Sequence, residues 1–87
     1  MSDIDKAFGS AVKTRRLQLG LSQEALAFQA GLHRTYISDL ERGRKGPSLR
    51  VVLRIAFALD MTAPDLVQLT ENHALSKSTL EERNNTD

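Results

Sequence analysis

The chain has 87 residues, no cysteine and a formal net charge of +1, with 40% hydrophobic and only 5% aromatic residues. This length allows one domain with a modest core, and the lack of cysteine excludes disulfides, thiolate nucleophiles and cysteine-based zinc sites. No stretch approaches the roughly 20 apolar residues of a membrane span, and an acidic start with Asp3 and Asp5 is not typical of a signal peptide, so we expect a cytoplasmic protein with no membrane partner.

The charges are divided unevenly along the chain. Residues 13–54 hold nine basic and three acidic residues, net +6, whereas residues 1–12 carry −1 and residues 55–87 carry −4. A basic middle between acidic ends favours a polyanionic partner for the middle segment. An ordinary solvated surface would show the same distribution, so charge alone leaves both interpretations open.

Apolar spacing in the first half predicts three helices, over about residues 4–19, 23–30 and 33–43. Gly20 and Gly31 suit the left-handed conformation that ends the first two, and Ser22 suits the N-cap of the second. Ala27, Gly31 and Ile37 have the spacing of a helix-turn-helix. The small Ala27 lets two helices cross, Gly31 permits a positive φ in the turn, and Ile37 fills the angle between the helices.

The second half predicts two further helices and no strand. Ser48 caps a fourth helix, whose broad apolar stripe contains Leu49, Val52, Leu53, Ile55, Ala56 and Leu59. Thr62 caps a fifth helix, in which Leu66 and Leu69 should face the core. The sequence becomes polar after Glu71. We therefore expect one domain over residues 1–71 and a polar, flexible tail over residues 72–87, with at most one helical turn near Leu80.

The chain resembles the Xre family of lambda-type phage repressors and Cro proteins in residues 16–27, Gly31, residues 34–43 and Pro-Ser-Leu (47–49). Within these, Leu-Ser-Gln-Glu-x-Leu-Ala (21–27) and Arg-Thr-Tyr-Ile-Ser-x-x-Glu-x-Gly (34–43) are also similar to controller proteins of restriction–modification systems, although many chromosomal regulators share them. The resemblance covers about residues 8–69. It implies an all-α, five-helix, lambda-repressor-like domain that binds a two-fold double-stranded DNA operator as a homodimer, with the helix at about 33–43 in the major groove.

The start of that recognition helix carries the candidate base-reading residues. Arg34 can bond two acceptors of guanine, and the methyl group of Thr35 can contact a thymine methyl. Ser38 and Asp39 lie four residues beyond them on the same face, and Asp39 could accept a hydrogen bond from cytosine. The alternatives are an Arg34 that reaches only phosphate and an Asp39 that is a plain surface charge.

A second group of residues is expected at the DNA backbone. Ser22 and Gln23 begin the second helix, whose free N–H groups can hold a phosphate, and Gln23 matches the family's phosphate-contacting glutamine. The alternative is that they form a plain cap. The remaining candidates lie on or after the recognition helix: Tyr36, Arg42, Arg44 and Lys45.

Two structural sets complete the expectations. Arg16 lies on the stripe of Phe8 and Val12, and Glu41 lies on the stripe of Ile37, so we expect a partly buried ion pair, as the family's matching residues make. The dimer interface is expected at the fifth helix and its surroundings, where apolar residues fall beside the core stripes: Val51, Met61 and Val67.

No catalytic or cofactor site is expected. His33 and His73 lack companion ligands for a metal, and neither a nucleophile–base pair nor a phosphate-cradling glycine loop is present. The sequence therefore favours a transcription regulator of the repressor type. The alternative is an antitoxin-type interaction module with autoregulatory DNA binding, although the tail offers only Leu75 and Leu80 as apolar anchors for a toxin.

Overall fold

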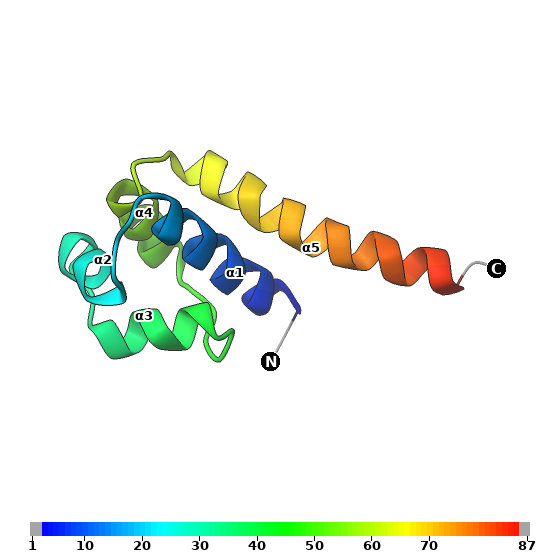
Figure 1. The fold of residues 1–87 in the computed structure, drawn as a ribbon, viewed down its shortest axis with the longest axis horizontal. Coiled ribbons are helices and arrows are strands. Elements are labelled where there is room, and N and C mark those ends of the chain that lie inside the picture. Colours follow the sequence, from blue (N-terminus) through cyan, green and yellow to red (C-terminus); the bar gives the residue numbers. More distant parts are fainter. Residues whose placement is uncertain (1–2, 86–87) are drawn as a thin grey trace.

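The computed structural model describes residues 3–85, with side chains described as far as Leu75. This part of the chain contains no strand, and its five helices confirm the expected all-α class: α1 (Asp3–Gln18), α2 (Gln23–Ala30), α3 (Arg34–Glu41), α4 (Leu49–Ala58) and α5 (Ala63–Asn85). Helix α1 packs against α3 and α5, and α4 packs against α2 and α5. The pair α2–α3 is therefore backed by α1 and α4, and α3 lies along one edge of the domain (Figure 1).

Local hydrogen bonds define the helix starts that the sequence predicts. The hydroxyls of Ser22, Ser48 and Thr62 accept hydrogen bonds from backbone N–H groups three residues on, at 3.0, 3.2 and 3.2 Å. Each such cap stabilises a helix by about 1 kcal/mol. His33 occupies the same position before α3 and makes no side-chain cap bond. Helix α3 therefore depends on its packing rather than on a cap.

The core lies between the five helices and is almost entirely aliphatic. Its fully buried large side chains come from every helix: Val12, Leu26, Ile37, Leu40, Ile55, Leu59 and Leu66. Ala27 is 3% exposed, and Gly31 has φ 70°, as the helix-turn-helix spacing predicts. Two buried side chains of α3, at Ile37 and Leu40, anchor this short helix to the rest of the domain.

The expected core stripe of α4 is partly wrong. Ile55, Ala56 and Leu59 are buried, but Leu49 and Leu53 are 76% and 54% exposed. The reason is geometric. Helix α4 packs against α2 and α5, and Leu49 and Leu53, which are four residues apart, lie on a side of the helix that both neighbours leave largely exposed. Ile4 and Leu19 are also more exposed than expected, because they lie at the two ends of α1.

The fifth helix is longer than expected. It continues past Glu71 as far as Asn85 and extends beyond the other four helices (Figure 1). Residues 72–85 contain no glycine or proline, so nothing in the sequence interrupts the helix. The side chains of residues 76–87, including Leu80, lie outside the described part of the chain. The division into a domain over residues 1–71 and a tail over 72–87 stays a prediction.

Candidate nucleic-acid interface

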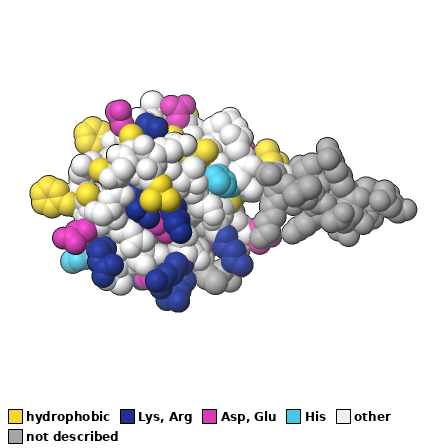
Figure 2. Space-filling view, in the orientation of Figure 1, with side chains coloured by type: hydrophobic (Ala, Val, Ile, Leu, Met, Phe, Trp, Pro, Cys, Tyr) yellow, Lys and Arg dark blue, Asp and Glu magenta, His cyan; other side chains and the backbone are white. Residues whose placement is uncertain are grey.

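The solvent-facing side of α3 brings together the residues expected to read bases. Arg34 and Thr35 are exposed in its first turn, and Ser38 is partly exposed one turn later, whereas Ile37 and Leu40 are buried on the opposite side. Within the described residues Arg34 makes no ion pair. Figure 2 shows lysine and arginine side chains gathered along the edge where α3 lies. This edge therefore presents a basic, polar helix face supported from behind by the core.

A buried cluster holds this face in place. Arg16 Nε lies 2.7 Å from Glu41 Oε2 and Arg16 Nη2 lies 2.9 Å from Glu41 Oε1, so the two side chains expected to pair form a two-point contact. Arg16 Nη1 also donates to the carbonyl of Leu21 at 2.8 Å. The side chains are only 8% and 3% exposed, and the hydrogen bond with Glu41 raises the pKa of Arg16 although its burial lowers it. The pair joins α1 to the end of α3.

Gln23 belongs to the same cluster, which the sequence did not indicate. Its side-chain amide donates to Glu41 Oε1 at 3.1 Å. A glutamine amide carries two N–H groups, so one remains available beside the N-terminus of α2. Ser22 uses its hydroxyl to cap the same helix. The structure thus leaves the phosphate-binding roles of both residues as predictions, and it shows that Glu41 holds one end of the Gln23 amide.

Gly9 permits the close contact between α1 and α3. A β-carbon at this position would collide with the backbone carbonyls of Leu40 and Glu41. Residue 9 lies among buried residues of α1, on the side that faces the end of α3. The sequence pattern shows only a helical glycine there, and no local signal distinguishes it from a simple weak point in the helix. Its role is to let the recognition helix approach α1 closely.

The basic loop after α3 contains cations in two different settings. Arg42 and Arg44 are exposed and make no ion pair with any described residue. Lys45 Nζ instead lies 3.6 Å from Asp39 Oδ2 and 5.7 Å from the centre of the Tyr36 ring. Asp39 and Lys45, which the sequence assigned to separate contacts with DNA, therefore contact each other.

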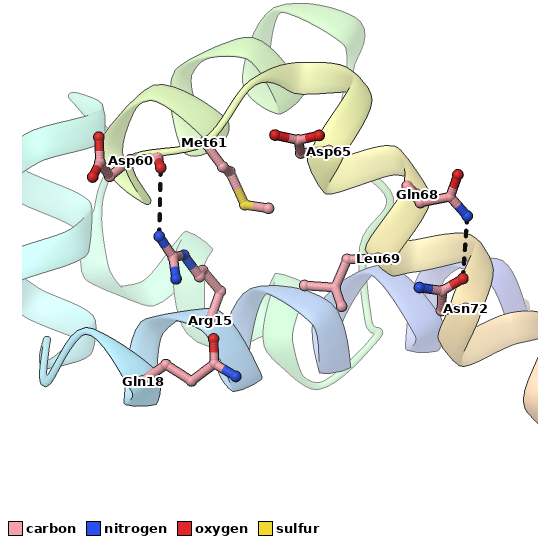
Figure 3. Close-up of a pocket in the computed structure, with 8 residues that line it drawn as sticks. All are labelled: Arg15, Gln18, Asp60, Met61, Asp65, Gln68, Leu69 and Asn72. Atoms are coloured by element: carbon pink, nitrogen blue, oxygen red, sulfur yellow. Dashed lines mark hydrogen bonds between the residues drawn. The ribbon is translucent and has the colours of Figure 1, made fainter.

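Arg15 is another basic residue whose guanidinium group makes hydrogen bonds within the protein. Its guanidinium donates to the carbonyl of Leu59 at 3.0 Å and to that of Asp60 at 3.4 Å, at the end of α4. Asp60 has a left-handed φ of 56°. Figure 3 shows the bond to the Asp60 carbonyl in a hollow between α1 and α5, where Gln68 and Asn72 also bond each other at 3.1 Å. The hollow has a volume of about 400 Å³. Arg15 thus ties α1 to the end of α4.

The expected dimer residues have different surroundings. Val51 and Met61 are half-buried and pack against the core, whereas Val67 is 48% exposed. Val67 lines an apolar groove of about 320 Å³ together with Ile4, Pro47 and other residues of α1, α4 and α5. A separate outer stripe of α4 comprises Leu49, Leu53 and Phe57, and Phe28 of α2 is 86% exposed. The three residues of the α4 stripe are four positions apart in the sequence, which is the spacing that places side chains on one face of a helix.

The described part of the chain contains no cluster of three or more side chains suited to a metal ion. Among the same residues, none of the helices combines the length and the apolar character needed to cross a membrane.

Comparison with known proteins relates this geometry to a family. Residues 12–66 match the family model described as helix-turn-helix. The control protein C.BamHI of Bacillus amyloliquefaciens is 44% identical over 70 residues, which cover 79% of this chain and 86% of the relative. The restriction–modification controller protein C.AhdI of Aeromonas hydrophila has a structure with a TM-score of 0.69 and 42% identity, covering 71% of this chain and 94% of that one. The structure of the C.Esp1396I controller tetramer in complex with its natural 35 base-pair operator has a TM-score of 0.80 and 27% identity, covering 86% and 99%.

Proposed function

This chain belongs to the helix-turn-helix family, and we propose that it is a transcriptional regulator of the restriction–modification controller type that binds a two-fold DNA operator as a dimer. The observation that carries the proposal is the solvent-facing side of α3, where Arg34 and Thr35 are exposed on a helix whose other side is fixed in the core. The controller proteins described above support the assignment, because C.Esp1396I is solved as a tetramer on its operator.

The proposed contacts divide into base reading and backbone binding. Helix α3 enters the major groove, where Arg34 meets a guanine edge and Thr35 and Ser38 contact neighbouring bases. Arg42 and Arg44 bind phosphates beside the groove. Their exposed guanidinium groups have no competing carboxylate among the described residues.

A third backbone contact is proposed at the start of α2. The Gln23 amide and the N-terminal N–H groups of this helix hold a phosphate, and Ser22 contributes by fixing the first turn.

The dimer contact is proposed at the groove that contains Val67. Val51 and Met61, the other two expected interface residues, do not line this groove and pack against the core instead. Pro47, which also lines the groove, follows closely after α3 along the chain. A two-fold contact there would bring the ends of two recognition helices toward one another. Such helices must lie about 34 Å apart to enter successive major grooves on one face of DNA.

Selection of bound sequences from a random double-stranded DNA library tests the proposal. The expected result is a two-fold symmetric site, bound by two chains or a multiple of two in sedimentation experiments. Arg34→Ala should remove the preference at one base pair per half-site, whereas Arg54→Ala, which changes an exposed arginine on α4, should leave the selected site unchanged. Selection of no sequence, or binding of single chains only, would contradict the proposed function.

A further inference from the structure

Three side chains beside the recognition face form a cluster that the proposed contacts do not use. Lys45 Nζ lies 3.6 Å from Asp39 Oδ2 and 5.7 Å from the centre of the Tyr36 ring. Tyr36 and Asp39 are three residues apart on α3 and so lie on one flank of this helix. The loop backbone is joined to the same place, because the N–H of Arg44 donates to the carbonyl of Asp39 at 2.9 Å. The cluster therefore places the Lys45 ammonium beside Asp39 and Tyr36.

The position of Asp39 is unsuited to reading a base. Its side chain is only 20% exposed, and its Oδ2 already faces the Lys45 ammonium. Thr35, Ser38 and Asp39 share the exposed face of α3, but of these three only Asp39 has a cation beside its side chain. A base donor that approached Asp39 would have to share its carboxylate with this ammonium.

The position of Lys45 is equally unsuited to free phosphate binding. Its side chain is 57% exposed, but a phosphate must compete with Asp39 for it. Together the two groups carry no net charge, in contrast to Arg42 and Arg44, which are exposed without an ion-pair partner among the described residues. The count of basic residues near α3 therefore overstates the charge presented to DNA.

We propose that Asp39 is a positioning residue that acts through Lys45: it holds this cation off the DNA backbone and thereby limits the binding of DNA of any sequence. The inference rests on the proposed function. It assigns Asp39 to the control of sequence-independent affinity, and each subunit then makes about one phosphate contact fewer than its exposed cations would allow.

A double-mutant cycle with Asp39→Asn and Lys45→Gln tests this role. Asp39→Asn should tighten binding to operator and to random DNA alike, by about two- to fivefold, the range of an exposed ion pair. It should also steepen the salt dependence by up to about one unit per subunit, because one more cation displaces counterions. Lys45→Gln alone should change little, and in the Asp39→Asn background it should remove the gain.

Two comparisons separate this mechanism from simpler ones. Removing any carboxylate weakens repulsion of DNA, so Asp60→Asn, at an exposed left-handed position that asparagine tolerates, measures that general effect. A gain that persists in the Lys45→Gln background would overturn the proposal. So would an Asp39→Asn chain that loses only operator affinity and changes its preferred base, because that is the behaviour of a base reader.

The contact itself can be tested without DNA. The melting temperatures of the wild-type chain, the two single variants and the double variant should be non-additive, because the two side chains interact. Additive melting temperatures would overturn the proposal. If the melting temperatures are coupled but the wild-type chain binds neither operator nor random DNA, the proposed function fails and the effect of Asp39 on DNA binding falls with it.

Discussion

Replacing Glu41 by alanine should destabilise the domain by about 3–5 kcal/mol, the cost typical of removing one partner from a buried ion pair. The structure supports a destabilisation of this size, because the side chains of Arg16 and Glu41 are only 8% and 3% exposed. Glu41 accepts two hydrogen bonds from Arg16 and one from Gln23. The substitution thus leaves a buried guanidinium without its partner. An exposed pair would cost only about 0–1 kcal/mol.

Thermal unfolding followed by circular dichroism measures the effect. In a domain of this size about 1 kcal/mol shifts the melting temperature by roughly 4–8 °C, so Glu41→Ala should lower it by more than about 10 °C. Glu41→Gln keeps one acceptor oxygen and should cost less. The double change Arg16→Met with Glu41→Leu should return close to wild type, since apolar replacement of a buried pair is often neutral or stabilising. A Glu41→Ala chain that melts within about 2 °C of wild type would refute the reasoning.

Three further predictions follow from the same geometry. Arg34→Ala should cost about 1–3 kcal/mol on operator and little on random DNA, whereas Arg44→Ala should weaken both equally and reduce the salt slope by about one unit per subunit; titrations of both DNAs at two salt concentrations compare them, and equal losses for Arg34→Ala would make it a phosphate contact. Val67→Asp should weaken dimerisation at least tenfold in sedimentation equilibrium, whereas Phe57→Asp on the outer stripe of α4 should not, and the reverse order would move the interface to α4. Gly9→Ala should destabilise the domain by about 1–3 kcal/mol in denaturant unfolding, because its β-carbon meets backbone carbonyls, and an unchanged midpoint would show that α1 can shift freely.

The sequence predicts local features of the fold well. Caps at Ser22, Ser48 and Thr62 depend on hydrogen bonds to residues three positions away, so they can be read from a short segment. The helix-turn-helix is predicted for the same reason, since Ala27 and Gly31 act within a few residues of their own positions. The start of each helix in the described chain lies within one residue of its expected position.

Features that depend on distant neighbours were not predictable in the same way. Gly9 matters because the end of α3 passes over it, and Arg15 because the carbonyls ending α4 lie beside it. Leu53 fits a helical core stripe, but only the arrangement of α2 and α5 decides which half of that stripe is covered. The contact of Lys45 with Asp39 depends on the path of a loop, which the sequence pattern does not specify.

The bond between Gln23 and Glu41 has a consequence for the entropy of binding. The carboxylate that accepts from Gln23 is the same one that holds Arg16, so the start of α2, the end of α3 and α1 meet at one buried group. A side chain ordered before the ligand arrives loses little rotamer freedom on binding, whereas ordering a free one costs about 0.5–1.5 kcal/mol. In the complex proposed above, the Gln23 amide would therefore meet a phosphate with its side chain already ordered. Complex formation should then carry a smaller conformational penalty at this position than at the exposed Arg42 and Arg44, which make no ion pair with any described residue.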